Sequence, residues 1–245
     1  RVEQRVAHDA DPAPGLRVRL LGPLVIERNG QPLPVPSSRK ARGLLAYLAL
    51  SSHAVARSHL CELLWDLPND PRGELRWCLS KLRALLDEPG RARVLAEGET
   101  LRLNLEGAHV DAHAWQAAVH AGLGSFDTDR LRALSSLARG EFLEGLEIER
   151  SAPWSGWLLA QRRHWRATRV ALLEHLAGAL EPGGDEALAA LEAWLALAPF
   201  DRRAHESMLD ALARRGRLHE GDAHLAVAAR AFEAQAQDWT PLGRL

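Results

Sequence analysis

Two stretches in the first part of the chain alternate apolar and polar residues, which is the pattern of strands with one buried face. The first, LRVRLLGPLVIERNGQPLPV (residues 16–35), contains Asn29-Gly30, a strong signal for a two-residue hairpin turn. The second, RVLAEGETLRLNL (residues 93–105), alternates on both sides of Glu97-Gly98-Glu99. The pattern therefore predicts two sets of short antiparallel strands.

Apolar residues at helical spacing lie between these two stretches. One helix is expected from about residue 38 to 50 with Ser37 or Ser38 as its N-cap, a second from about residue 57 to 65, and a third after Asp70. The inner face of the first helix carries Leu44, Leu45 and Leu48. Strands, three helices and a terminal hairpin predict a winged helix-turn-helix. In that fold the third helix can lie in the major groove of DNA, and the hairpin, called the wing, can reach neighbouring phosphates.

The third predicted helix, within DPRGELRWCLSKLRALLDE (residues 70–88), has two different sides. Asp70 is a good N-cap, and Pro71 stands at the first helical position, where its missing N–H costs nothing. At about 100° per residue, the apolar positions fill an arc about 120° wide, and three arginines lie within about 40° of one another on a different side. The apolar positions are Leu75, Cys78, Leu79, Leu82, Leu85 and Leu86, and the arginines are Arg72, Arg76 and Arg83. The arginine side is either a solvated surface or a surface that reads DNA.

Beyond Val110 the pattern is helical throughout. Asp111 is expected to cap a helix that carries Trp115, and further helices are expected at about residues 128–138, 153–180, 185–197, 201–214 and 217–235. The segments EALAALEAWLAL and EGDAHLAVAARA align Ala189 with Ala223, 34 residues apart, which is the tetratricopeptide period. Small residues at these two positions would let paired helices approach closely. We therefore predict an α-solenoid with a concave surface for a protein or small ligand.

Composition and charge add a division into two parts. A chain of 245 residues with 47% hydrophobic residues suffices for two domains, and no apolar run approaches the roughly 18 residues that span a bilayer, which predicts a soluble protein. Residues 16–106 hold 14 Lys and Arg against 10 Asp and Glu, whereas residues 107–245 hold 15 against 19. A basic front and an acidic back suggest a part that contacts DNA joined to a part that contacts protein.

The two cysteines and the N-terminus bear on location. Cys61 and Cys78 fall on apolar helix faces and form no CxxC or other metal-ligand spacing, so we expect buried free thiols in a reducing cytoplasm. Residues 1–15 are polar and contain proline, unlike a signal peptide, and are expected to form a disordered tail.

Several segments, taken in order, resemble the SARP family of bacterial transcriptional activators. In the front half they are LRVRLLGPLVI, NGQPLPVPSSRKARGLLAYLAL, LCELLW, LRWCLSKLRALL and LRLNLEGAHVDAHAW; in the back half they include GEFLEGL and ERSAPWSGWLLAQRR. The resemblance implies a mainly α fold with a small β part. It places a winged helix-turn-helix DNA-binding domain at residues 16–106 and an all-α, tetratricopeptide-like bacterial transcriptional activation domain at residues 107–245.

The resemblance also implies a function. Members of the family bind tandem direct repeats near a promoter and contact RNA polymerase or its sigma factor, which implies a cytoplasmic DNA-binding regulator that forms a homodimer or tandem assembly on double-stranded DNA. No cofactor, metal, membrane or enzymatic activity is expected. The implied DNA-contacting residues, with the wing included, are Arg72, Arg76, Trp77, Ser80, Lys81, Arg83, Arg93 and Arg102. The sequence departs from the family in three places. Ala56 replaces a serine cap, and Glu74 would repel phosphates, although it could accept a hydrogen bond from a cytosine amino group. The C-terminal segment FEAQAQDWTPLGRL lacks the closing pattern of the family.

Three other groups of residues have both a functional and a simpler structural interpretation. His109, His113 and His120 are interpreted as surface histidines rather than metal ligands. The acidic run Glu141, Glu144, Glu147 and Glu149 is interpreted as a solvated loop rather than a contact for a basic partner. The group Trp154, Trp157 and Trp165 is interpreted as core of the activation domain rather than the lining of a ligand pocket.

The alternative function is a helical protein-interaction or ligand-sensing module whose winged helix contacts protein. The salt dependence of DNA binding separates it from the DNA-binding function. No phosphate loop, GxSxG or HExxH motif of an enzyme occurs in the sequence.

Overall fold

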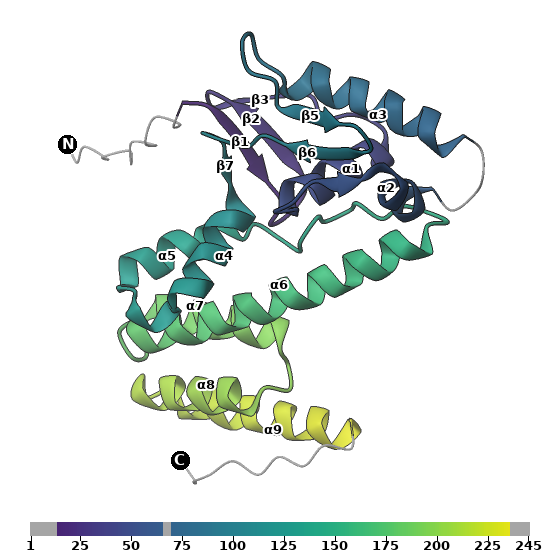
Figure 1. Cartoon of the computed structure of the whole chain (residues 1–245). Helices are drawn as coiled ribbons and strands as arrows, with labels where there is room; N and C mark the ends of the chain where they lie inside the picture. Colours follow the sequence, from purple (N-terminus) through teal and green to yellow (C-terminus); the bar gives the residue numbers. More distant parts are fainter. Residues whose placement is uncertain (1–13, 66–69, 236–245) are drawn as a thin grey trace, which may run out of the picture. The chain divides into compact units, whose positions relative to one another are not determined.

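The computed structural model describes residues 14–65 and 70–235, and most of the tail predicted at residues 1–15 lies outside them. The chain divides into two compact units (Figure 1). The first unit runs to Ala117 and also includes Arg139–Arg162, and the second comprises Ala118–Ala138 and the chain from Arg163 onward. Short strands occur in the first unit and the second is helical, which confirms the predicted mainly α fold with a small β part.

The first predicted hairpin forms part of a four-stranded sheet. Its strands, in the order β3-β2-β1-β7, are β3 (Gln31–Pro32), β2 (Val25–Arg28), β1 (Leu16–Arg19) and β7 (His109–Val110). Strand β1 pairs antiparallel with β2 and parallel with β7. The turn between β2 and β3 is Asn29-Gly30, with φ angles of 50° and 76°. Two successive positive φ angles are what this dipeptide accommodates in a tight hairpin turn.

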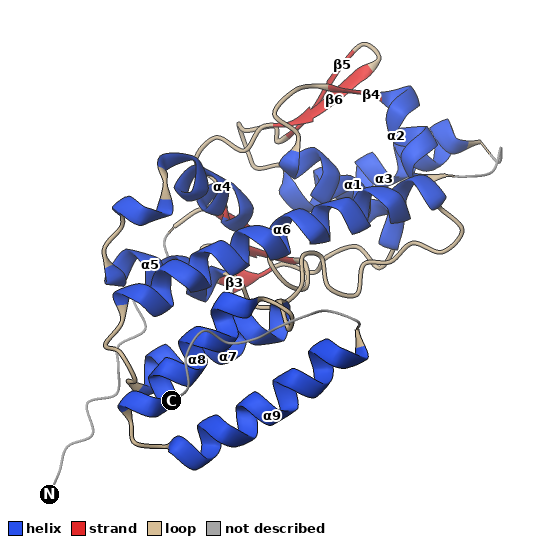
Figure 2. Cartoon of the chain, turned by 90° about the horizontal axis from the view of Figure 1, so that it is seen from below, coloured by secondary structure: helices blue, strands red, loops and turns tan. Residues whose placement is uncertain are grey.

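The three helices and the wing follow as predicted. The helices are α1 (Arg39–Leu50), α2 (Arg57–Leu64) and α3 (Pro71–Leu86). Ser38 is the N-cap of α1, since its hydroxyl oxygen accepts a hydrogen bond from the Ala41 amide at 3.2 Å. The second sheet, β4-β6-β5 (Figure 2), joins β4 (Val55–Ala56) to the wing strands β5 (Val94–Glu97) and β6 (Thr100–Leu103), which a Gly98-Glu99 turn connects.

Leucines from the three helices form the core of the winged helix. Each is no more than 2% exposed, and each fully buried leucine contributes about 1.5 to 3 kcal/mol relative to an exposed one. They include Leu44, Leu45, Leu48, Leu60, Leu64, Leu75, Leu79, Leu82 and Leu86. This core supports α3, with α1 and α2 packed against it.

Two later segments return to the first unit, so its boundary differs from the one expected near residue 107. Helix α4 (Asp111–Ala121) starts with a buried carboxylate that accepts hydrogen bonds from the amides of Leu20 at 2.8 Å and Leu21 at 3.0 Å. The sequence assigned this aspartate a capping role, and its bonds to the end of β1 escaped prediction because they join residues about ninety positions apart.

The start of the long helix α6 (Ala152–Ala179) also belongs to the first unit. Trp154 is fully buried, and its indole N–H donates to the carbonyl oxygen of Leu146 at 3.0 Å. A Cβ atom added at Gly43 on α1 would come within 3.1 Å of this indole. The glycine therefore permits the close approach of the tryptophan to α1.

The second unit is a series of packed helices. They are the later part of α6, α5 (Thr128–Leu137), α7 (Asp185–Leu197), α8 (Arg202–Arg214) and α9 (Leu218–Ala234), with a short 3₁₀ helix, η1 (Leu123–Ser125). Helix α8 packs against both α7 and α9 (Figure 2). Every helix in the described part of the chain is too short or too polar to cross a membrane.

The small residues that allow this packing are not the ones predicted. Ala189 and Ala223 are both exposed, so the expectation that they bring helices together is wrong. The buried small residues of α7 and α9 at the same 34-residue offset are Ala187 and Gly221. They precede the predicted pair by two positions, which on a helix is about 200° of rotation and so the opposite side.

Candidate nucleic-acid interface

The start of α3 is fixed by a local cap. Asp70 adopts a left-handed conformation with φ of 44°, and its Oδ1 atom accepts a hydrogen bond from the Gly73 amide at 3.0 Å. Pro71 follows at the first helical position. A Cβ atom at Gly73 would lie 2.1 Å from Asp70 Oδ2, so a larger residue there would displace the capping carboxylate. The predicted helix start is confirmed, with Gly73 as a requirement that the sequence did not reveal.

The two sides of α3 separate as the pattern predicted. Five of the six apolar positions are buried and Leu85 is partly buried. The opposite side is exposed and includes Arg72, Arg76, Trp77, Ser80, Lys81 and Arg83. Trp77 is 48% exposed, and the Lys81 ammonium nitrogen lies 5.3 Å from the centre of its ring. An aromatic ring carrying a cation can offer a base edge both an apolar surface and a positive charge.

Three cations on this side are without an ionic partner. Arg76, Lys81 and Arg83 form no ion pair with any residue that the structure describes. Arg72 is different, because its Nη1 atom lies 3.1 Å from Glu99 Oε2 in the wing turn. Unpaired cations at an exposed surface attract anions such as phosphate groups more strongly than neutralised ones.

The wing supplies one exposed cation and one buried cation. Arg102 on β6 is exposed and lies 3.6 Å from Glu97. Arg93, expected among the DNA-contacting residues, is 1% exposed. Its guanidinium donates to the carbonyl oxygens of Asn104 at 3.2 Å and Glu106 at 2.8 Å and pairs with Glu88 at 3.1 Å. Arg93 therefore closes the base of the wing and is not available to DNA.

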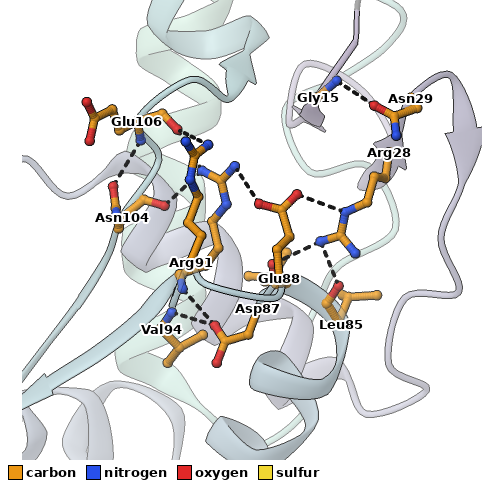
Figure 3. A network of polar contacts seen from close by, with 12 residues as sticks. Gly15, Arg28, Asn29, Leu85, Asp87, Glu88, Arg91, Val94, Asn104 and Glu106 are labelled. Carbon is orange, nitrogen blue, oxygen red and sulfur yellow. Dashed lines mark hydrogen bonds and ion pairs between the residues drawn. The ribbon is translucent and has the colours of Figure 1, made fainter.

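The end of α3 is tied to the first sheet by charged residues that the sequence analysis missed (Figure 3). Arg28 on β2 donates to the carbonyl oxygen of Leu86 at 2.9 Å and pairs with Glu88 at 3.2 Å. Asp87 Oδ1 accepts from the amides of Arg93 at 2.7 Å and Val94 at 3.0 Å. A cation at a helix C-terminus satisfies its free carbonyls and opposes its negative end. Helix α3 is thus held at both ends.

Helix α2 begins next to the wing turn. Ala56 is its N-cap and makes no side-chain hydrogen bond, so the serine cap of the family has no substitute here. The Arg57 amide instead donates to the carbonyl oxygen of Glu99 at 2.8 Å. The wing turn thus satisfies one of the free amides at the start of α2.

The histidines and the acidic run of residues 141–149 have different surroundings. His113 binds the carbonyl oxygen of Ala49 through Nε2 at 2.7 Å, and no cluster of three or more metal-binding side chains exists among the described residues. In the acidic run, Glu147 and Glu141 pair with Arg162 at 2.7 and 3.5 Å. The hydrogen bond from Arg162 lowers the pKa of the Glu147 carboxyl. This run is therefore partly neutralised within the first unit rather than wholly solvated.

The two cysteines and two of the three tryptophans predicted as core residues are buried. Cys61 and Cys78 are buried free thiols, as predicted, and burial raises the pKa of Cys78 to about 11, which disfavours the reactive thiolate. Trp154 and Trp157 lie in the first unit, with ring centres 4.8 Å apart, and Trp165 lies in the second. The prediction of core positions is confirmed for Trp154 and Trp165, although Trp154 belongs to the core of the winged-helix unit.

The chain is similar to proteins already known. It is 31% identical over 218 residues to the regulatory protein AfsR of Streptomyces coelicolor. The match covers 84% of this chain and 21% of AfsR, so the chain spans about a fifth of the length of that relative. A solved structure of Mycobacterium tuberculosis EmbR in complex with a low affinity phosphopeptide matches with a TM-score of 0.62 and 22% identity, over 90% of this chain and 60% of the EmbR chain. The likeness to EmbR shows a shared fold. No protein-family model matches the chain.

Proposed function

We propose that this chain belongs to the SARP family of bacterial regulatory proteins and is a sequence-specific DNA-binding regulator of transcription rather than an enzyme. The observation that carries the proposal is the exposed side of α3, on a helix capped at its start and held at its end. Arg76, Lys81 and Arg83 on this side form no ion pair within the described part of the chain. A helix that is rigid, exposed and cationic can enter the major groove, and at these three positions it does so without first breaking an ion pair.

Positions along α3 suggest distinct roles. Arg76, near the start, can reach a base edge, and a bidentate contact to guanine contributes about 1 to 3 kcal/mol of discrimination. Lys81 and Arg83 lie further along and suit phosphates, which add affinity without sequence information. Arg102 in the wing suits a phosphate beside the groove. Trp77 and Ser80 would contact the groove between the base edge that Arg76 reaches and the phosphates that Lys81 and Arg83 bind.

The proposal extends to promoter architecture and partners. As in the family, the chain would bind tandem direct repeats in the bacterial cytoplasm as a homodimer or tandem assembly and activate transcription through RNA polymerase or its sigma factor. The DNA-binding part would be the winged helix of residues 16–106, supported by residues 109–117 and 139–162. The helices of the second unit would be the activation part, since packed helical repeats of this kind present surfaces to proteins.

The test is selection of duplexes from a random-sequence pool by the full chain, followed by titration of the selected and the random DNA. We expect a recurring motif among the selected duplexes and an affinity that falls steeply between about 50 and 200 mM salt. A chain that selects no motif is not a sequence-specific regulator. A chain that binds no duplex would instead support the protein-interaction module.

A further inference from the structure

The turn of the wing is acidic and is anchored beside the starts of α2 and α3. Glu97-Gly98-Glu99 forms this turn, with Gly98 at a φ of 57°. The Arg57 side chain donates to the Gly98 carbonyl oxygen at 3.3 Å, and the Thr100 hydroxyl donates to the Glu97 carbonyl oxygen at 3.0 Å. With the bond from the Arg57 amide to Glu99, these contacts fix the position of the turn.

Glu99 holds one of the cations expected to meet DNA. Its carboxylate lies 3.1 Å from the Arg72 guanidinium, and the two side chains are 71% and 58% exposed. Arg72 is in the first turn of α3, where the helix N-terminus also attracts anions. Glu99 therefore occupies the place beside Arg72 that a phosphate oxygen of bound DNA would take.

We propose that Glu99 is an internal competitor of DNA phosphate for Arg72 and thereby limits the affinity of the chain for DNA. The inference rests on the proposed DNA-binding function. An exposed ion pair is weak, so a phosphate can displace Glu99, yet the displacement offsets part of the gain from the new contact. Because phosphates carry no sequence information, the competition lowers affinity for all duplexes by the same factor.

The removal of the Glu99 charge is the direct test, measured in the full chain by fluorescence anisotropy on a random duplex and on a selected duplex. Glu99→Gln keeps the shape and the backbone hydrogen bonds of the turn. We expect tighter binding to both duplexes by one common factor. In the parent the displaced Glu99 carboxylate stays nearby and offsets the charge of Arg72. Without that charge the chain neutralises about one phosphate more, so Glu99→Gln should lose about threefold more affinity than the parent between about 50 and 200 mM salt.

Two further variants show whether the effect acts through Arg72. In an Arg72→Ala background, Glu99→Gln should have no effect, since no cation remains to be released. Glu106→Gln is the matched control, because it removes an exposed carboxylate that follows the same wing and has no ion pair among the described residues. It should bind like the parent, and the melting temperature of every variant should match the parent.

Three results would overturn the inference. The inference is wrong if Glu99→Gln binds both duplexes like the parent. It is also wrong if Glu99→Gln gains the same affinity with and without Arg72, which would indicate general repulsion. A changed sequence motif would indicate that Glu99 reads a base. The proposed function fails separately, when the parent binds DNA without selecting any motif. Absence of binding by both the parent and Glu99→Gln would overturn both.

Discussion

The two units of the molecule differ in how their charged residues are paired. In the first, Arg93 and Asp111 are buried in hydrogen-bond networks, and three cations on the outer side of α3 have no ion pair with another described residue. In the second, several arginines are paired at the surface, either with a neighbouring helix or within their own helix. Examples with N–O distances of 2.6 to 2.7 Å are Arg132 with Glu186, Arg203 with Glu174 and Arg214 with Asp210.

This difference explains how a cationic surface for DNA can be told from a solvated one. Both units contain helices with several arginines on their polar sides. A paired arginine must lose its carboxylate before it can bind a phosphate, whereas an unpaired one loses only water and counterions. Exposed arginines without an ion pair to another described residue, such as Arg202 and Arg230, also occur in the second unit. The grouping of three such cations on one side of one helix therefore marks α3 as the candidate interface.

The largest expected effect concerns the buried network of the first unit. Asp111→Asn replaces a carboxylate that accepts from three amides, those of Leu20, Leu21 and Ala112, with an amide group that offers one acceptor oxygen. A buried amide left without its partner costs about 1 to 3 kcal/mol. Urea denaturation should show a loss of unfolding free energy of this size.

The matched control lies in the second unit. Asp210→Asn also neutralises an aspartate, but this side chain is 63% exposed, and Arg214 is its one ionic partner among the described residues. The urea unfolding midpoint of the Asp210→Asn variant should equal that of the parent. Equal losses for Asp111→Asn and Asp210→Asn would remove the distinction between buried and surface charge on which the comparison of the two units depends.

The next effect distinguishes two arginines on α3. Arg76→Ala should relax preference at one base-pair position by about 1 to 3 kcal/mol, because a base-edge contact is lost. Arg83→Ala should weaken binding to all sequences alike and reduce the magnitude of the salt slope by about one. Titration of selected duplexes with single substitutions, at several salt concentrations, measures both.

Neither substitution should alter folding, since both side chains are exposed and such changes usually shift stability by no more than about 0.5 kcal/mol. Melting curves are the control. If both variants bind the selected DNA like the parent, the unpaired arginines only keep the protein in solution, and the physical support for the interface is lost.

Local signals in the sequence were enough to predict much of this interface. Asp70 and Pro71 mark the start of α3, and the spacing of its leucines fixes which side faces solvent. These features depend on neighbours within a few residues, which the sequence displays directly. The same holds for Asn29-Gly30 and for the bounds of most helices.

Contacts between distant residues were not predictable in this way. Nothing local distinguishes Arg93, which is buried, from Arg102, which is exposed, because the carbonyl groups that satisfy Arg93 come from the chain beyond β6. The bonds of Asp111 to Leu20 and Leu21 are equally remote. The spacing of apolar residues also did not decide which side of α7 packs against its neighbours, since alanines occur on both of its sides.

A smaller effect concerns pH and His205, the one buried polar side chain among the described residues of the second unit. Its Nε2 atom lies 2.7 Å from the Pro199 carbonyl oxygen, and its Nδ1 atom lies 3.0 Å from His224 Nε2. Burial, followed by the charge of His205, lowers the pKa of His224 below its ordinary value of 6.5. The unfolded chain therefore binds this proton more readily than the folded chain.

The unfolding free energy should consequently fall as the pH drops below about 6.5 toward the lower folded pKa of His224, and should not change through His224 above about pH 7.5. Urea midpoints measured across this range test the sign. His224→Gln keeps a side chain that can donate to His205 but cannot titrate, so its midpoint should depend less on pH. A parent that becomes more stable on acidification in this window would contradict the direction of the shift.

The smallest expected effect comes from Arg214→Ala, the counterpart of Arg83→Ala in the second unit. Arg214 and Asp210 form an exposed pair one helical turn apart, and such pairs are screened by salt and hold long side chains at an entropic cost. Since Arg214 is already neutralised and lies outside the candidate interface, its removal should leave both the melting temperature and the DNA salt slope as in the parent. A loss of DNA affinity as large as that of Arg83→Ala would mean that paired arginines also serve binding. The pairing of charges would then fail as the feature that separates the two units.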